Sequence, residues 1–132
     1  LHSFPTRRSS DLAAFAQPTV EAIRDALIAA GTEFAKRALE GLGQRSPLAL
    51  KATLEALTRD HGYTRLEDAL TAEFRLCTHL YERGEFPEGV RALIVDKDRK
   101  PKWNPPTLAE VTPAMVDALF QAFPPSEEPF TP

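Results

Sequence analysis

The sequence has one cysteine, Cys77, among 132 residues, together with a single tryptophan and a single methionine. One thiol excludes an intrachain disulfide framework and is typical of a reducing compartment. No apolar run approaches the roughly 18 residues that a membrane span needs, so no membrane partner is expected. The net charge of −3 gives no overall attraction for nucleic acid, which is also not expected as a partner.

Strand signals are scarce as well. Residues 92–95 form the only β-like run, and no hairpin turn accompanies it. Residues 13–123 instead repeat helical apolar spacing between glycines, prolines and capping residues, which predicts an all-α fold for this region. Residues 124–132 are rich in proline and acidic side chains, and we expect them to form a disordered tail.

The first 12 residues have neither a helical nor a strand period. Residues 2–11 match the in-frame translation of a common short-read sequencing adapter; a transit peptide is the alternative, because the segment contains two arginines and three serines. We favour the adapter and expect residues 1–12 to be a disordered artefact. The reading frame would then begin where an assembled DNA fragment ends, and we expect the natural protein to extend upstream of Ala13.

Glycines, prolines and capping residues predict where the helices begin and end. Gly31 ends a helix that starts at Val20, Thr32 caps the next helix, and Ser46-Pro47 opens a third. Apolar spacing predicts that the third helix buries Leu50, Leu54 and Leu57.

The longest helix is predicted from Thr64, where Thr64–Glu67 has the capping-box spacing, to about Arg83. Its expected packing stripe consists of Leu66, Leu70, Phe74, Cys77 and Tyr81, widened by Leu76 and Leu80. Cys77 is therefore predicted to be a buried small hydrophobe. A nucleophile–base pair with His79 is the weaker interpretation, because residues two apart on a helix do not face each other.

Residues 85–123 contain two further predicted helices. The first runs from Phe86-Pro87 to about Val95 and leads into a charged segment, residues 96–102. The second starts at Thr112-Pro113, and its apolar side consists of Met115, Val116, Leu119, Phe120 and Phe123.

The segment from Glu88 to Trp103 is the most informative in the chain. A Glu-Gly pair follows Glu73 by fifteen residues and leads through Ala92-Leu93 and basic residues to Pro101-Lys102-Trp103. This arrangement resembles the C-terminal end of crotonase-superfamily enzymes. The Asp-Lys-Asp form, two residues longer than in typical hydratases, is similar to 3-hydroxyisobutyryl-CoA hydrolases.

The resemblance implies that the chain is the helical C-terminal part of an α/β spiral enzyme that hydrolyses 3-hydroxyisobutyryl-CoA in valine degradation. In that family the catalytic groups lie on an N-terminal core, and no motif of this chain matches them. We therefore expect no catalytic residue here, no cofactor beyond the CoA of the substrate, and no activity from the chain alone. The implied partners are the acyl-CoA substrate, the missing N-terminal core and further copies in a homo-oligomer.

Lys97, Arg99 and Lys100 are the candidate binding residues. With Lys102 they place four cations in six residues, and the resemblance implies contact with CoA phosphates. The alternative is a solvated loop that keeps the surface soluble. No metal site is expected, since His61 has no partner at ligand spacing and fits a helix end or the surface.

Glu73 matches a family position, and an ion pair, for example with Arg91, is its expected role. Three hypotheses remain open: a hydrolase fragment, a fragment of another crotonase-superfamily enzyme such as a hydratase or isomerase, and a stand-alone helical interaction module. In the intact enzyme the apolar helix faces would be covered, so the isolated chain is expected to expose them. The alanine-rich composition favours a bacterial cytoplasm; a eukaryotic enzyme of this kind would be mitochondrial.

Overall fold

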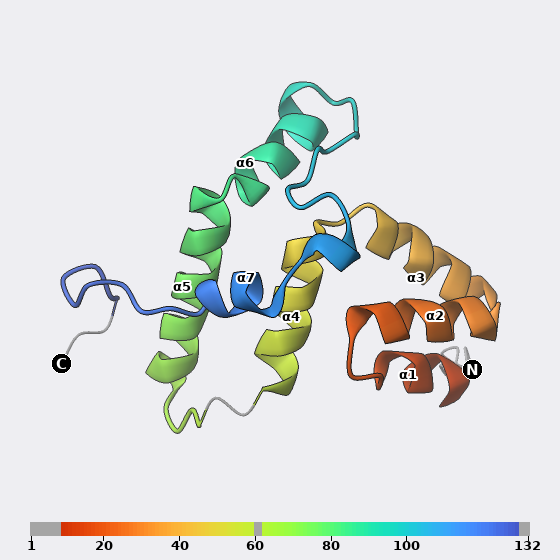
Figure 1. Ribbon diagram of the computed structural model, residues 1–132, viewed down its shortest axis with the longest axis horizontal. Coiled ribbons are helices and arrows are strands. Elements are labelled where there is room, and N and C mark those ends of the chain that lie inside the picture. The colour runs from red at the N-terminus through yellow and green to blue at the C-terminus, as the bar shows by residue number, and fades with distance from the viewer. Residues whose placement is uncertain (1–8, 60–61, 130–132) are drawn as a thin grey trace, which may run out of the picture. The chain divides into compact units, whose positions relative to one another are not determined.

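The structure is a computed structural model that describes residues 9–59 and 62–129, with side chains from Leu12 onward (Figure 1). Every regular element in these ranges is helical, which confirms the all-α prediction. The chain divides into two compact units, Leu1–Arg45 and Ser46–Pro132. His61 lies outside the described residues, so its predicted role is not addressed.

The first unit contains three helices, which are α1 (Ser9–Phe15), α2 (Val20–Ala30) and α3 (Glu33–Gly43). Thr19 and Thr32 cap α2 and α3 through side-chain oxygens that accept backbone N–H groups at 3.1 Å. Gly31 ends α2 with a φ of 60°, as predicted. Because α1 begins at Ser9, it starts four residues before the boundary expected at Ala13. The artefact origin of residues 1–12 stays a prediction.

The second unit contains six short or medium helices, which are α4 (Pro47–Thr58), α5 (Leu66–Glu82), α6 (Glu85–Val90), the π-helix η1 (Arg91–Val95), the 3₁₀-helix η2 (Leu108–Glu110) and α7 (Pro113–Ala118). Its buried core joins α4 to the segment around α7, and consists of Leu48, Ala52, Val111, Val116 and Leu119. The predicted caps Ser46 and Thr112 each accept a backbone N–H at their helix starts.

The face of α4 that packs in the core differs from the predicted one. Leu48 and Ala52 are fully buried, whereas Leu57 is 79% exposed. The predicted Leu50–Leu57 face is wrong because η2 and α7 pack against the other side of the helix. Those elements come from more than 50 residues later in the chain.

The stripe predicted to pack on α5 is confirmed only in part. Leu66, Leu70, Phe74 and Tyr81 are exposed, and so is Cys77, which is therefore not a core residue. Leu76 and Leu80, which widen the predicted stripe, do pack against the core. The expected exposure of apolar helix faces is confirmed for Leu66, Leu70, Phe74 and Tyr81.

The start of α5 is held by a different acid from the predicted one. Asp68 Oδ2 accepts the backbone N–H groups of Thr64 and Arg65, at 3.1 and 3.0 Å. Glu67 instead lies 3.0 Å from the guanidinium of Arg65. The N-cap is Arg65, one residue later than the spacing predicted, so the capping acid moves one residue along as well.

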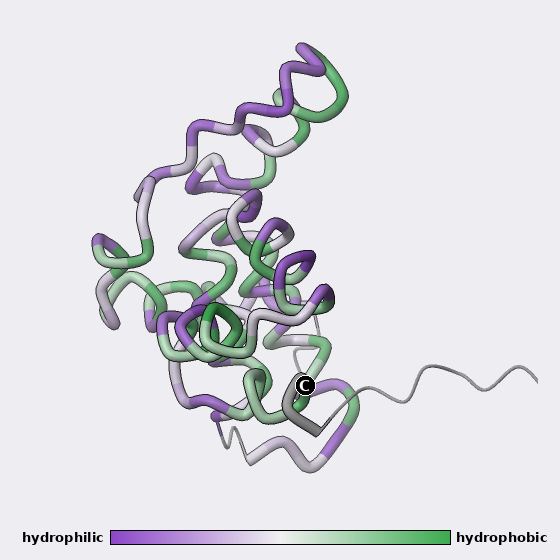
Figure 2. Tube along the Cα trace, turned by 90° about the vertical axis from the view of Figure 1, so that its right-hand side faces the viewer, coloured by the Kyte–Doolittle hydropathy of each residue, from purple (hydrophilic) through white to green (hydrophobic). Residues whose placement is uncertain are grey.

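The helix predicted over residues 86–95 is split. It is α-helical over Glu85–Val90 and widens into the π-helix η1 over Arg91–Val95. Leu93, Ile94 and Val95 are all more than 60% exposed on η1. Figure 2 shows this end of the unit as an apolar run followed directly by a hydrophilic one. The hydrophilic run is the charged segment that the sequence singled out.

Candidate functional site

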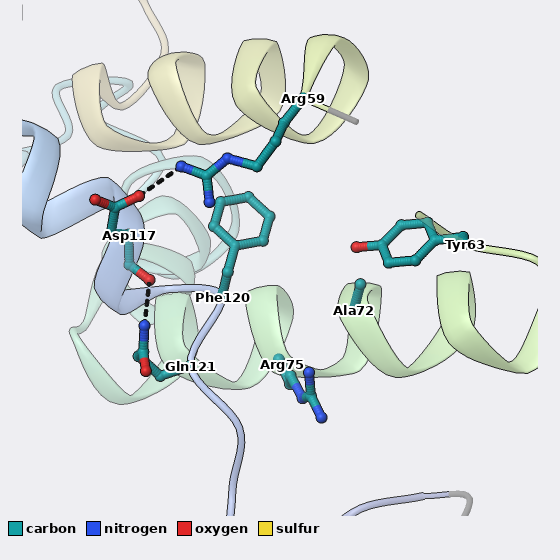
Figure 3. A pocket seen from close by; sticks show the side chains of 7 residues that line it. All are labelled: Arg59, Tyr63, Ala72, Arg75, Asp117, Phe120 and Gln121. Carbon is teal, nitrogen blue, oxygen red and sulfur yellow. Dashed lines mark hydrogen bonds and ion pairs between the residues drawn. The ribbon is translucent and has the colours of Figure 1, made fainter. Parts of the chain in front are cut away.

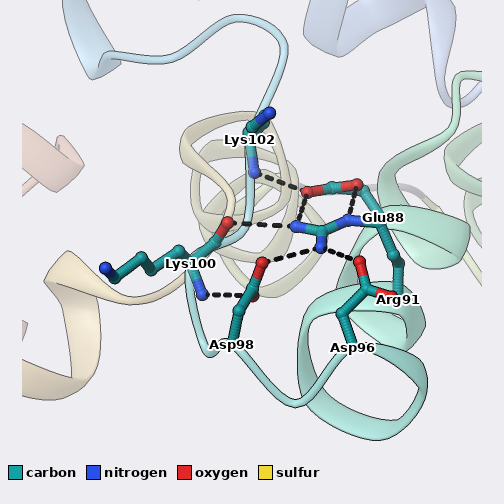
Figure 4. Close-up of polar contacts among 6 residues, drawn as sticks. All are labelled: Glu88, Arg91, Asp96, Asp98, Lys100 and Lys102. Carbon is teal, nitrogen blue, oxygen red and sulfur yellow. Dashed lines mark hydrogen bonds and ion pairs between the residues drawn. The ribbon is translucent and has the colours of Figure 1, made fainter.

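The charged segment is organised around the guanidinium of Arg91 (Figure 4). Nε and Nη2 donate to the two carboxylate oxygens of Glu88, at 2.9 and 2.8 Å. Nη1 donates to Asp96 at 2.5 Å and to Asp98 at 2.8 Å, and Nη2 also donates to the carbonyl of Lys100 at 3.1 Å. A guanidinium has five N–H donors, so every donor of Arg91 is used.

Two of these carboxylates also hold the loop backbone. Asp98 Oδ1 accepts the N–H of Lys100 at 2.8 Å, and Glu88 Oε1 accepts the N–H of Lys102 at 2.6 Å. The loop is thereby closed back over η1, where the N–H of Arg99 donates to the carbonyl of Ala92 at 2.9 Å. We call Glu88, Arg91, Asp96 and Asp98 the Arg91 network.

The electrostatics of the network favour its ionised form. The hydrogen bonds from Arg91, helped by the N–H of Lys102, lower the pKa of Glu88 from its ordinary value to about 2. The hydrogen bond from Arg91 also lowers the pKa of Asp98, and the carboxylates in turn raise the pKa of Arg91. Glu88, Arg91 and Asp98 are therefore charged at neutral pH.

The three predicted binding residues are all exposed side chains of this loop. Lys97, Arg99 and Lys100 are exposed, and Figure 4 shows the side chain of Lys100 pointing away from the carboxylates. Lys97 and Arg99 have left-handed backbone, with φ of 56° and 54°. Such a conformation costs a non-glycine residue roughly 1–2 kcal/mol, so the contacts around it must hold it. Residues 88–102 carry five basic and three acidic side chains, a local excess of positive charge.

The loop continues into Trp103, which packs on α6. A Cβ placed on Gly89 would lie 3.4 Å from Cη2 of the Trp103 ring, so the glycine leaves room for the indole. Beside it, Glu85 is only 6% exposed, and its Oε1 accepts the N–H of Asn104 at 3.4 Å. The other oxygen, Oε2, has no hydrogen-bond partner among the described residues.

A cavity of about 410 Å³ lies elsewhere in the same unit (Figure 3), lined by Arg59, Tyr63, Ala72, Arg75, Asp117, Phe120 and Gln121. Its cations are already neutralised. Arg59 binds Asp117 at 2.6 Å and also pairs with Glu55, and the guanidinium of Arg75 lies 2.8 Å from Glu128. No sequence motif pointed to this cavity, because its lining comes from three separate stretches of chain. Both of its arginines are therefore engaged in ion pairs within the chain.

His79 and the end of the chain are linked. The His79 ring stacks on Phe123 with centroids 4.3 Å apart, and Nε2 lies 3.1 Å from the carbonyl of Gln121. These contacts engage His79 with the C-terminal segment, as expected for a residue that does not pair with Cys77. Glu128 binds Arg75 and accepts the N–H of Phe123 at 2.7 Å, so this residue of the predicted tail has defined partners.

The ion pair expected between Glu73 and Arg91 is not formed. All five N–H donors of Arg91 bind other groups, which are Glu88, Asp96, Asp98 and the carbonyl of Lys100. The signal for one partner was available, because Glu88 precedes Arg91 by three residues, a spacing at which helical side chains meet. The α-helical spacing rule predicts neither Asp96 nor Asp98. Asp96 ends the π-helix, where its N–H donates to the carbonyl of Arg91 at 2.8 Å, and Asp98 lies in the loop beyond it.

In residues 9–59 and 62–129, no group of three or more His, Cys, Asp or Glu side chains is arranged to hold a metal ion. Within the same ranges, no helix combines the length and the apolar character that crossing a membrane requires.

Comparison with known proteins decides the family. A sequence model described as enoyl-CoA hydratase/isomerase matches residues 4–120. The chain belongs to this family. It is 40% identical over 106 residues to the mitochondrial 3-hydroxyisobutyryl-CoA hydrolase of Xenopus laevis, covering 80% of this chain and 27% of that protein. The human enzyme of the same name is 39% identical over 108 residues, which are 82% of this chain and 28% of that protein.

Other relatives carry different names. The small ribosomal subunit protein mS47 of Arabidopsis thaliana is 38% identical over 104 residues, covering 76% of this chain and 25% of that protein. A carnitinyl-CoA dehydratase structure from Mycobacterium thermoresistibile matches 88% of this chain and 32% of its own, with a TM-score of 0.77 and 37% identity. The structure of an enoyl-CoA hydratase from Rhodobacter sphaeroides matches 90% of this chain and 36% of its own, with a TM-score of 0.75 and 37% identity.

These matches confirm the predicted crotonase superfamily and the likeness to 3-hydroxyisobutyryl-CoA hydrolases. The solved neighbours have the crotonase fold, which agrees with a helical C-terminal part of such an enzyme. The chain spans about a quarter of the length of the curated relatives that it matches.

Proposed function

We propose that this chain is the C-terminal part of an enzyme that hydrolyses the thioester of 3-hydroxyisobutyryl-CoA. The observation that carries the proposal is the 38–40% identity to hydrolases of that name over about 80% of the chain. The Asp-Lys-Asp segment that ends in Pro101-Lys102-Trp103 supports the same branch, because typical hydratases have a shorter one.

The reaction breaks the C–S bond of the thioester with water and yields a free acid and the CoA thiol. It needs hydrogen-bond donors for the oxyanion and acidic groups for proton transfer or nucleophilic attack. We place these groups on the part of the relatives that this chain does not match. The chain alone is therefore expected to have no hydrolase activity.

Within such an enzyme, Lys97, Arg99 and Lys100 are the groups that we assign to the phosphates of CoA. Their exposure, their separation by only three positions and the local positive charge support this role. Arginine and lysine bind phosphate as a two-pronged donor and as a point charge, respectively. For a eukaryotic source we propose a mitochondrial location, since the hydrolases that match are named as mitochondrial.

Hydration or dehydration of an acyl-CoA is the second candidate activity. It is favoured by the two solved neighbours, a dehydratase and a hydratase, whose 37% identity is close to that of the hydrolases. Both candidates use a CoA thioester, so the proposed phosphate contacts belong to either one.

A chimera separates the two activities. Residues 13–129 replace the corresponding segment of the human hydrolase in one protein and of the Rhodobacter sphaeroides hydratase in the other. We expect thioester hydrolysis by the first chimera at a rate near that of its parent and loss of activity in the second. A folded first chimera without hydrolysis, beside an active second one, would refute the hydrolase assignment.

The phosphate contacts are tested in the active chimera. Reversing charge at Lys97 and Lys100 to Glu should raise the KM for the CoA ester at least about tenfold, because two attractive contacts become repulsive. Charge reversal at Lys36, in the first unit, is the matched control. An unchanged KM after reversal at Lys97 and Lys100 would remove these residues from the CoA site.

A further inference from the structure

We propose that Arg91 is the positioning residue of the charged segment, residues 96–102. Its guanidinium binds the acids of the Arg91 network, so that Lys97, Arg99 and Lys100 remain available to a phosphate ligand. This inference rests on the proposed function, because it concerns the same three cations. It adds a residue that touches no substrate and acts through the backbone that it holds.

The guanidinium of Arg91 connects several parts of the segment (Figure 4). The five donors of Arg91 fork onto Glu88 on one side and reach Asp96, Asp98 and the carbonyl of Lys100 on the other. The guanidinium thus connects Glu88, near the end of α6, to several positions of the loop between Asp96 and Lys100. A lysine ammonium has three donors and no fork, so it cannot make this set of bonds.

The loop backbone has an unusual conformation. Lys97 and Arg99 both have φ near 55°, a region that L-residues with long side chains rarely adopt. The amides that follow are fixed by members of the Arg91 network, since Asp98 accepts from Lys100 and Glu88 accepts from Lys102. Such a conformation persists only where its surroundings over-determine it, and it then points to function.

Opposite charges are close together in this part of the chain. Glu88, Asp96 and Asp98 lie within twelve residues of the exposed cations Lys97, Arg99 and Lys100. If Arg91 were absent, these acids would repel one another and the neighbouring cations would be their nearest counter-ions. With Arg91 in place, one central cation binds all three acids. The outer cations can then meet the negative charge of a ligand.

The test uses the full 132-residue chain with Arg91→Gln, Arg91→Lys and the control Arg83→Gln, which removes an exposed arginine at the end of α5. Trp103 is the single tryptophan and follows the amide that Glu88 holds, so its emission reports the loop. We expect red-shifted emission and faster hydrogen exchange at the Lys100 and Lys102 amides in both Arg91 variants. The control should match the wild type.

The second readout is binding of coenzyme A, with pantetheine as the probe that lacks phosphates. Replacing Lys97, Arg99 and Lys100 together by Gln should weaken coenzyme A binding about tenfold or more, without changing the Trp103 emission. Arg91→Gln should weaken it to a similar extent, and Arg91→Lys should not restore it although the charge is kept. Pantetheine binding should be the same in all variants.

The outcomes separate the two proposals. If the triple variant binds coenzyme A as the wild type does, the phosphate contact itself is refuted, and the positioning role falls with it. In another outcome, the triple variant binds more weakly while Arg91→Gln leaves the Trp103 emission, the exchange of the two amides and coenzyme A binding unchanged. The phosphate contact then stands, and the positioning role is refuted. Full rescue by Arg91→Lys would likewise refute it, because charge alone would then suffice.

Unfolding of the unit in Arg91→Gln would blur this result, so Asp98→Ala is the second variant. It removes one acid of the network and the acceptor for the Lys100 amide, and it leaves the fork between Arg91 and Glu88 intact. We expect faster exchange at Lys100, unchanged exchange at Lys102 and severalfold weaker coenzyme A binding. Equal protection of Lys100 in this variant would contradict the proposal.

Discussion

The ring of Trp103 lies against α6 at Gly89, where a Cβ would be 3.4 Å from Cη2 of the indole. The loop that carries the cationic residues thus ends in an aromatic side chain packed on the helix that precedes it. The absence of a side chain at position 89 and the hydrogen bond from Lys102 to Glu88 act on the same few residues. Packing and charge together close the loop.

Substitutions at Gly89 should show how much room the indole has. A methyl group at 3.4 Å makes an ordinary contact, so Gly89→Ala should raise the free energy of unfolding by up to about 1 kcal/mol through helix propensity. Gly89→Leu should displace the ring and shift its emission to longer wavelength. Denaturant unfolding followed by Trp103 fluorescence measures both, and an unshifted emission in Gly89→Leu would contradict the packing.

The loop should open at low pH. Arg91 lowers the pKa of Glu88 from 4.5 to about 2, so the ionised carboxylate stabilises the folded loop. That contribution is fully present above about pH 4.5 and is lost as the pH falls through 2. Trp103 emission should therefore change between these values, and NMR titration should place the Glu88 carboxyl in this range. Glu88→Gln should remove the transition, and an unaltered pH profile in that variant would contradict it.

Core substitutions should separate the buried face of α4 from the exposed one. Leu48 and Leu119 are fully buried, so replacing either by Ala should lower the free energy of unfolding by about 2–5 kcal/mol. Leu57 is 79% exposed, and Leu57→Ala should change it by less than about 0.5 kcal/mol. Denaturant unfolding measures all three. A larger loss at Leu57 than at Leu48 would restore the face that the sequence predicted.

The thiol of Cys77 should be open to reagent. Because Cys77 is exposed and is the only cysteine, the folded chain should react with one equivalent of 5,5′-dithiobis(2-nitrobenzoate). Cys77→Ser should give no reaction and should leave the unfolding transition nearly unchanged. Labelling that requires denaturant would show that this face of α5 is covered, for instance by a second copy.

The sequence alone predicted several helix boundaries correctly, although not the capping acid of α5 or the change to a π-helix at Arg91. Gly31, Ser46 and Thr112 mark helix boundaries because each acts on the backbone within four residues of itself. The all-α fold follows from helical spacing for the same reason. The segment from Glu88 to Trp103 also identified the superfamily, because a motif needs only residue types and spacing.

Tertiary structure decided which faces are used and which charges meet. The sequence shows two apolar faces on α4 and on α5, and only packing against η2 and α7 selects Leu48, Ala52, Leu76 and Leu80 over their neighbours. In the same way, Arg91 meets Asp96 at the end of the π-helix η1 and Asp98 in the loop beyond it, where Lys97 and Arg99 have left-handed backbone. Periodicity describes one helix at a time, whereas burial and charge pairing depend on elements that the chain brings together only when it folds.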